Sequence, residues 1–153
     1  MNLTPHFSLS ELTASQEATR NHIDNTPAPA IVSNLKRLAG LLEAVRALVD
    51  APITISSGYR SPALNELVGG AANSAHMLGL AADIHTEKLS PGELAGMISE
   101  SGIVFDQLID EGRWVHIALS IGVLRRQVLR ARFGASGISF VAANIGLEAP
   151  VGR

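Results

Sequence analysis

Apolar residues recur at helical spacing along one segment of the chain, at Ile31, Leu35, Leu38, Leu42, Val45 and Leu48. This spacing places them on one side of an α-helix, and such a stripe has to be buried against another layer of the fold. Thr26 and Pro27 are the residue types expected at an N-cap and at a first helical position, and Asp50-Ala-Pro52 ends the segment. The stripe therefore predicts one long, half-buried helix.

Capping boxes mark two shorter helices. Ser8-Leu-Ser-Glu11 predicts a helix that starts near Leu9, and Ser90-Pro91-Gly-Glu93 predicts one that runs to about Glu100. A turn over residues 57–62 leads into a short helical segment through Leu67, which the glycine pair at 69–70 interrupts.

Strand-like runs follow at residues 53–56, 104–110 and 114–120, with weaker ones at 128–133 and 138–141. Gly112 lies between two of these runs and can adopt the positive φ that a two-residue type II′ hairpin turn requires. The pattern predicts an α+β fold in which the helices come first and pack on a small, mainly antiparallel sheet. We assign residues 1–142 to one domain and residues 143–153 to a C-terminal tail.

Composition limits the function classes. The chain has 153 residues, and its 46% hydrophobic content excludes intrinsic disorder. A formal net charge of −2 gives no electrostatic basis for binding nucleic acid or an anionic membrane. The chain contains no cysteine, so any zinc ion would be held by histidine and carboxylate side chains. We expect a monomer.

No export signal or membrane span is expected. Residues 1–24 carry charged and polar side chains throughout and contain no apolar stretch of the length a signal peptide requires. No uncharged apolar run approaches the ~20 residues of a membrane span. We therefore expect synthesis in the cytoplasm. A target outside the membrane would then require another component, such as a separate pore-forming protein, for release.

Three residues have the types and the placement of a catalytic metal site. His76 lies in a glycine-rich, loop-like stretch, Asp83 lies at the start of a predicted strand, and His116 lies inside another. Two imidazoles and one carboxylate can supply three ligands to zinc and leave the fourth position for water, which is the arrangement of catalytic rather than structural zinc sites.

These residues belong to three blocks that together resemble a known family: Ser57-Gly-Tyr-Arg60-Ser-Pro62, Ser74-x-His76-x-x-Gly79-x-Ala81-x-Asp83, and Trp114-x-His116. In this order they are similar to the zinc D-alanyl-D-alanine carboxypeptidases and peptidoglycan endopeptidases, above all the compact forms found in bacteriophage endolysins. The similarity covers most of the chain, from Phe7 to about Leu119.

The resemblance implies a Hedgehog- or DD-peptidase-like fold with one zinc ion per chain, bound by His76, Asp83 and His116. It implies that Arg60 holds a carboxylate or carbonyl of a peptidoglycan peptide, which a planar guanidinium does well as a bidentate donor. Ser74 is a candidate for substrate binding, although a hydrogen bond to a neighbouring loop explains it equally well.

One position departs from the family pattern. The family usually has an acidic general base three residues before the second histidine, where this chain has Arg113, which cannot accept a proton. If Gly112 and Arg113 form a two-residue turn, Glu111 lies on the same face of the hairpin as His116, as its diagonal neighbour. We therefore predict Glu111 as the base, while a register shift of one residue would select Asp110 instead.

Other residues admit simpler explanations. His85 shares a face with Asp83 in a regular strand and is a competing ligand, although the motif favours His116. Trp114 is expected to pack beside the metal site rather than to serve as a platform for the substrate. The basic residues Arg125, Arg126, Arg130 and Arg132 are expected to form a solvated face, with anionic cell-wall polymer as the alternative partner.

The sequence thus predicts a zinc peptidase that cleaves the peptide stems or cross-links of bacterial peptidoglycan, as an endolysin does after release to the cell wall. Two alternatives remain. One is a catalytically silent zinc-binding interaction module of the Hedgehog type, because the usual base is missing. The other is a carboxypeptidase that removes terminal D-alanine rather than an endopeptidase.

Overall fold

The fold was analysed in a computed structural model that describes residues 1–135 and 137–143. Its elements in chain order are β1 (Asn2–Thr4), β2 (Phe7–Ser8), α1 (Leu9–Thr13), α2 (Gln16–Arg20), α3 (Pro29–Val49), β3 (Thr54–Ser57), α4 (Pro62–Leu67), the 3₁₀ helix η1 (Ala75–Leu78), β4 (Ala81–His85), α5 (Pro91–Glu100), β5 (Gln107–Asp110), β6 (Val115–Ala118), β7 (Gln127–Gly134) and β8 (Gly137–Ala142).

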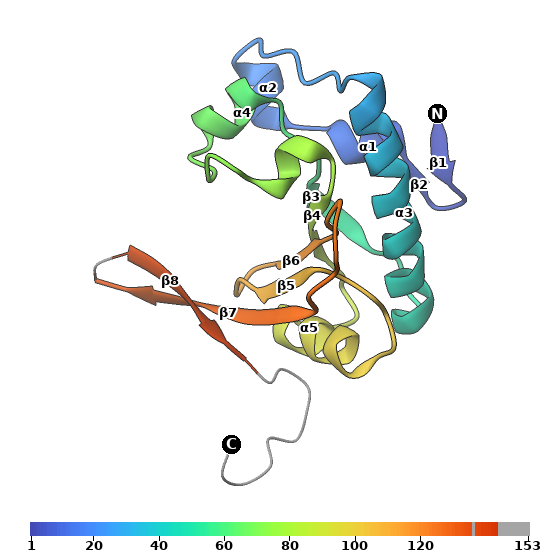
Figure 1. Cartoon of the computed structure of the whole chain (residues 1–153), viewed down its shortest axis with the longest axis vertical. Coiled ribbons are helices and arrows are strands. Elements are labelled where there is room, and N and C mark those ends of the chain that lie inside the picture. Colours follow the sequence, from blue (N-terminus) through green and yellow to red (C-terminus); the bar gives the residue numbers. More distant parts are fainter. Residues whose placement is uncertain (136, 144–153) are drawn as a thin grey trace, which may run out of the picture.

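One six-stranded sheet organises the molecule, in the order β3-β4-β6-β5-β7-β8 (Figure 1). All neighbouring strands run antiparallel except β5 and β7, which pair in parallel. The predicted α+β class with a mainly antiparallel sheet is confirmed. Strands β5 to β8 follow α5, as expected for helices first and sheet after, but β3 and β4 both precede α5, so that expectation is wrong for these two strands.

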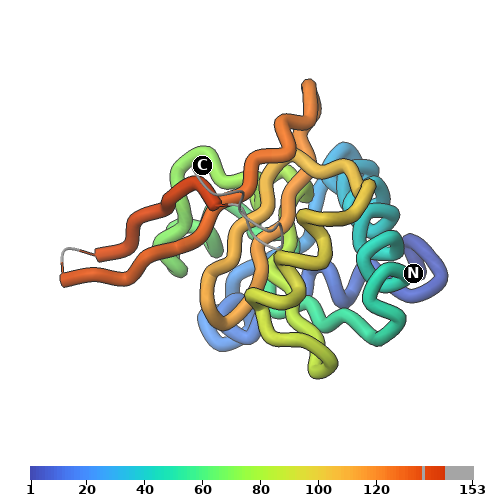
Figure 2. Tube along the Cα trace, turned by 90° about the horizontal axis from the view of Figure 1, so that it is seen from below, coloured from blue at the N-terminus to red at the C-terminus, as the bar shows by residue number. Residues whose placement is uncertain are grey.

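The long helix α3 supplies most of the helical part of the core. Leu35, Leu38, Leu42 and Val45 of the predicted stripe are fully buried, while Ile31 and Leu48 at its ends are only partly buried. The helix packs beside α5, and both lie on one side of the sheet (Figures 1 and 2). Among the described residues no helix is long and apolar enough to cross a membrane.

The start of α3 differs from the prediction. The helix begins at Pro29 with Ala28 as its N-cap, and no side chain caps it. Thr26 is not the cap because the Asp24 carboxylate accepts the backbone N–H of Thr26 at 2.9 Å, which holds this segment in a local turn. The two capping boxes are confirmed, with α1 starting at Leu9 and α5 running from Pro91 to Glu100.

The predicted hairpin between β5 and β6 is confirmed in its register. Ile109 pairs with His116, and the backbone N–H of Glu111 donates to the carbonyl of Trp114 at 3.0 Å. Gly112 has a φ of 88°, the left-handed conformation that the turn requires. Both strands are shorter than the apolar runs that predicted them.

The tail assigned to residues 143–153 lies outside the described residues from 144 onward, and the boundary of the domain at residue 142 stays a prediction. Residues 127–134 and 137–142 form strands slightly longer than expected. The small β1–β2 hairpin and helix α2 were not predicted, because each is too short to show a hydrophobic period.

Gly58 is a point where the backbone tolerates no side chain. A methyl group at this position would lie 2.3 Å from the carbonyl oxygen of Leu12, and the neighbouring Tyr59 N–H donates to the same oxygen. We expect Gly58→Ala to lower the free energy of unfolding by about 2–3 kcal/mol, because α1 would be forced away from the segment after β3. Chemical denaturation measures this.

Gly40→Ala is the matched control. Gly40 lies within α3 with no atom near the position of an added methyl group. The same substitution there should raise the free energy of unfolding by about 0.5–1 kcal/mol through helix propensity. Equal effects at the two positions would contradict the packing of α1 described here.

Candidate metal centre and active-site cleft

Asp83 and His116 form a directly opposed pair on neighbouring strands β4 and β6. Their neighbours Ala82, Ile84, Val115 and Ile117 belong to the hydrophobic core. Because side chains alternate along a strand, Asp83 and His116 project from the opposite face of the sheet. The sheet therefore presents a carboxylate and an imidazole side by side on the face away from the core.

His76 comes to this pair from the short helix η1. The Ser74 hydroxyl accepts the backbone N–H of His76 at 3.2 Å and caps the helix, and Gly79 ends it in a left-handed conformation with φ of 71°. The Nδ1 atom of His76 lies 2.7 Å from the carbonyl oxygen of Gly58. This contact assigns the ring proton to Nδ1, so Nε2 presents its lone pair toward Asp83.

The three side chains make a compact group. The Oδ1 atom of Asp83 lies 3.4 Å from His76 Nε2 and 3.1 Å from His116 Nδ1, and one ligand atom from each residue falls within 4.8 Å of the others. Tetrahedral ligands about 2.0–2.2 Å from a zinc ion lie about 3.3–3.6 Å apart. The spacing and the donor types fit a zinc ion with only small adjustments, and three ligands leave a fourth position open.

The Asp83 carboxyl is almost fully enclosed. Burial acts to raise its pKa, but the hydrogen bond with His116 and the favourable interaction with both imidazole rings outweigh burial and hold the pKa well below its usual range. Asp83 is therefore ionised at neutral pH. A buried, ionised carboxylate needs a positive partner, and a divalent cation bound between Asp83 and the two imidazoles would supply it.

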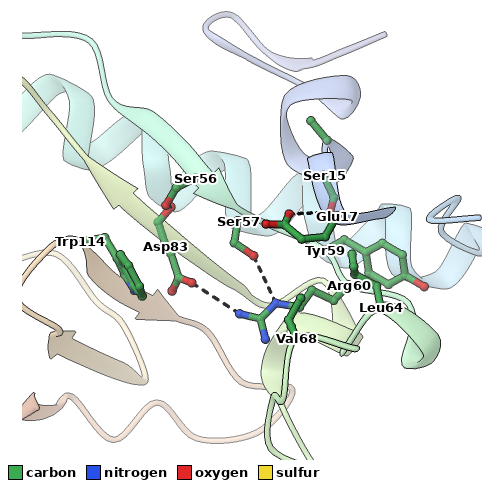
Figure 3. A pocket seen from close by; sticks show the side chains of 11 residues that line it. Ser15, Glu17, Ser56, Ser57, Tyr59, Arg60, Leu64, Val68, Asp83 and Trp114 are labelled. Atoms are coloured by element: carbon green, nitrogen blue, oxygen red, sulfur yellow. Dashed lines mark hydrogen bonds and ion pairs between the residues drawn. The ribbon is translucent and has the colours of Figure 1, made fainter. Parts of the chain in front are cut away.

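Arg60 lies beside the same carboxylate, as Figure 3 shows. Its Nη2 is 3.5 Å from Asp83 Oδ2, its Nε donates to the Ser57 hydroxyl at 3.2 Å, and its Nη1 donates to Asn65 Oδ1 at 3.1 Å. Asn65 in turn donates to the carbonyl of Ala71. The guanidinium is thus held in one orientation, with N–H groups left over for a substrate.

Glu111 lies at the edge of the group. Burial raises the pKa of its carboxyl, and the negative charge of Asp83 raises it further, against the opposing influence of His116 and a hydrogen bond from the Trp114 indole. Asp110 is directed elsewhere: its Oδ1 accepts the N–H of Gly112 at 3.0 Å and its Oδ2 lies 3.8 Å from Arg130 Nε. The two carboxylates therefore face different surroundings, as alternation along the strand predicts.

Two clefts open on the metal group from different sides. The Arg60 cleft, of about 360 Å³, is lined by Asp83 and Trp114 together with residues of α2, β3 and α4 (Figure 3). The His116 cleft, of about 410 Å³, is lined by Ser74, Glu111 and residues of the segments 71–80 and 118–125. Asp83 lines the first cleft and His116 lines the second, so the metal group adjoins both.

The structure also places the competing histidine and the group of basic residues. Among the residues that the structure describes, His85 is not part of the close histidine–aspartate group. Of the basic residues, Arg125 forms a bidentate ion pair with Asp106, and Arg126 donates to backbone carbonyls after α5. All four arginines of this group are nevertheless exposed, as expected for a solvated face.

Sequence reasoning did not find the two residues that orient the site from outside it. The Gly58 carbonyl fixes the His76 ring, and Asn65 positions Arg60. Gly58 belongs to the block of residues 57–62 that the sequence analysis identified. Its role could not be predicted, because every residue type has a backbone carbonyl. Asn65 looks like an ordinary polar residue of a short helix, although it is buried.

Comparison with known proteins agrees with this geometry. A family model described as Peptidase M15 matches residues 5–118, which is more than half of the chain and includes the whole metal group. The chain belongs to the peptidase M15 family. The M15 match ends at β6, so the β7–β8 hairpin lies beyond it.

A curated relative is the zinc D-Ala-D-Ala carboxypeptidase of Streptomyces albus G, to which this M15 chain is 54% identical over 44 residues. The aligned part covers 28% of this chain and 17% of that protein, so the chain spans only a small part of the relative's length. Family membership and the histidine–aspartate group together fit a zinc ion as the cofactor.

The geometry predicts which histidine substitution affects metal binding. His116→Ala removes one of three ligand atoms and should lower the affinity for zinc at least tenfold, because the remaining two ligands cannot hold a structured site. Titration with a zinc indicator dye measures this. His85→Ala, on the same strand as Asp83, should keep the affinity of the unmodified protein, and tight zinc binding by His116→Ala would contradict the assignment.

Proposed function

We propose that this M15 protein is a zinc peptidase that cleaves peptide stems or cross-links of bacterial peptidoglycan. The observation that carries the proposal is the close His76–Asp83–His116 group, with Glu111 beside it and two clefts that adjoin it. The similarity to a zinc D-Ala-D-Ala carboxypeptidase supports the substrate class.

In the proposed site one zinc ion per chain is held by His76, Asp83 and His116. When bound, zinc polarises a carbonyl and makes water a nucleophile near neutral pH. The chain's own part is to fix the ligands. The Gly58 carbonyl keeps the Nε2 of His76 free to ligate, and Asp83 stays ionised between its neighbours.

Glu111 is the proposed general base. Its raised pKa makes its carboxylate a better proton acceptor than an exposed glutamate, and the indole N–H of Trp114 donates to one of its oxygens and fixes its orientation. The carboxylate would take a proton from the attacking water and pass it to the leaving amine. Arg113, at the family's usual base position, is exposed at the turn.

Arg60 and Ser74 are the proposed substrate contacts, one in each cleft. Arg60 would anchor a carboxylate or a carbonyl of the peptide through the N–H groups that Ser57, Asn65 and Asp83 do not use. Ser74 accepts a backbone N–H as a helix cap, which leaves its hydroxyl hydrogen to donate to the substrate in the His116 cleft.

Clefts on both sides of the metal group favour an endopeptidase, because a carboxypeptidase needs space for only a short group beyond the scissile bond. Removal of terminal D-alanine is the second candidate, favoured by the name of the similar carboxypeptidase. Mass spectrometry of the fragments released from a defined cell wall separates the two, since an endopeptidase yields uncross-linked stems and a carboxypeptidase yields free D-alanine.

An endolysin role, with release to the cell wall by a separate pore-forming protein, is part of the proposal. The contrasting function is a zinc-binding interaction module without activity, of the Hedgehog type. Incubation of purified peptidoglycan with the protein, with and without a chelator, decides between enzyme and module. Release of peptide fragments that the chelator abolishes supports the enzyme, and no release by the zinc-loaded protein contradicts it.

The role of Glu111 has a direct test. Glu111→Gln keeps the size of the side chain and its contact with Trp114 but cannot take a proton, so it should bind zinc normally and lose about 10²–10⁴-fold in rate. Steady-state cleavage of a soluble cross-linked muropeptide, combined with zinc analysis, measures both.

Asp110→Asn is the control for this variant. Its carboxylate contacts Gly112 and Arg130 rather than the metal group, so the effect on rate should be much smaller. An inactive Asp110→Asn protein beside an active Glu111→Gln protein would assign the base to Asp110 instead.

A further inference from the structure

The β7–β8 hairpin has one apolar and one basic face. In its register Phe133 pairs with Ile138 and Ala131 pairs with Phe140, so these four side chains share one face. The alternate positions include Arg130, Arg132 and Ser139. Figures 1 and 2 show that the outer part of the hairpin projects from the body of the protein, so its two faces are not covered by a further layer.

The apolar face is exposed to an unusual degree. Phe133 is 66% exposed, Ile138 is 61% exposed and Phe140 is 51% exposed. Single exposed apolar residues are common on protein surfaces. Three large ones in neighbouring cross-strand positions form a continuous apolar patch, and its exposure to water is unfavourable. Such a patch indicates a surface that binds something.

A groove of about 550 Å³ runs along this face. Its opposite wall is the turn between β5 and β6, formed by Glu111, Gly112, Arg113 and Trp114. The two walls are close, since a methyl group at Gly112 would lie 3.6 Å from Cε2 of the Phe133 ring. The groove is therefore formed between the hairpin and the candidate active site, not on the hairpin alone.

The groove shares a lining residue with each cleft of the metal group. Trp114 lines the groove and the Arg60 cleft, while Glu111 lines the groove and the His116 cleft. A molecule bound at the metal group would therefore lie next to the wall of the apolar groove. These shared residues favour a substrate as the occupant, because a ligand in the groove contacts Trp114, whose indole N–H donates to Glu111.

We propose that the groove is a substrate subsite that binds the aliphatic part of the peptide on one side of the scissile bond. The inference rests on the proposed peptidase function and adds a specificity determinant to it. Peptide stems of peptidoglycan carry alanine methyl groups and the methylene arm of a diamino acid, and these would leave water by packing on Phe133, Ile138 and Phe140. The hairpin lies beyond the part of the chain that the family model matches, so this wall is an addition to the matched peptidase region.

The test compares two variants of the full-length, zinc-loaded protein. The double variant Phe133→Ser/Phe140→Ser removes the aromatic wall at exposed positions, and Val104→Ser removes an apolar residue that is 58% exposed elsewhere on the surface. With a soluble cross-linked muropeptide as substrate, the double variant should raise KM about tenfold, equivalent to about 1.4 kcal/mol, with kcat nearly unchanged. Val104→Ser should leave both constants unchanged, and equal KM values for all three proteins would overturn the proposal.

A second readout separates this inference from the peptidase proposal. Trp114 is the only tryptophan in the chain and lines the groove, so its fluorescence should change when an uncleaved tetrapeptide stem binds. The change should saturate in the original protein and in Val104→Ser and should require about tenfold more peptide in the double variant. This result would support the subsite even if no muropeptide were cleaved, whereas cleavage with identical KM values would retain the peptidase and reject the subsite.

Self-association is the competing use of the apolar face. If sedimentation shows a dimer that the double variant dissociates while KM and the fluorescence titration stay unchanged, the face binds a second copy of the chain and the subsite is wrong. A monomeric protein with the expected shift in KM supports the subsite.

Discussion

A buried carboxylate determines how the rest of this site is built. Asp83 lies in the second strand of the sheet, enclosed by the protein, and removal of an ionised group from water is costly unless it has charged or hydrogen-bonding partners. The fold supplies those partners from three directions: His116 across the strand pair, His76 from a short helix and Arg60 from the segment after β3. Each partner is itself restrained: His116 by strand pairing, His76 by the Gly58 carbonyl and Arg60 by Asn65.

The position of Asp83 in a central strand of the sheet determines which side chains surround it. Strand β4 lies between β3 and β6, so the carboxylate has His116 on one side and Ser57, which contacts Arg60, on the other. One face of the same strands packs on α3 and α5 to form the core, and the other face carries the site. Core packing therefore fixes the strands, and the strands fix two of the three candidate ligand residues. The hairpin turn at Gly112 then places Glu111 on the site face and Asp110 away from it.

Several elements of the fold could be predicted from the sequence because they depend on residues close together in the chain. The apolar stripe of α3, both capping boxes and the β5–β6 turn depend on neighbouring residues, and each was located correctly. The start of α3 was not, because the Asp24 side chain binds the Thr26 N–H in a local turn that competes with a helix cap. The parallel pairing of β5 with β7 could not be predicted, since it depends on a connection through residues 119–126 that has no periodic pattern.

The three candidate metal ligands were predicted from spacing and resemblance, and the structure brings them together. Their orientation could not be predicted, because it depends on the Gly58 carbonyl and on Asn65. The most direct test of the central claim is X-ray absorption at the zinc edge of the zinc-loaded protein. The account predicts a four-coordinate ion with two imidazole nitrogens and oxygen ligands at about 2.0–2.2 Å. An all-oxygen, six-coordinate shell, or a shell with a single imidazole, would contradict it.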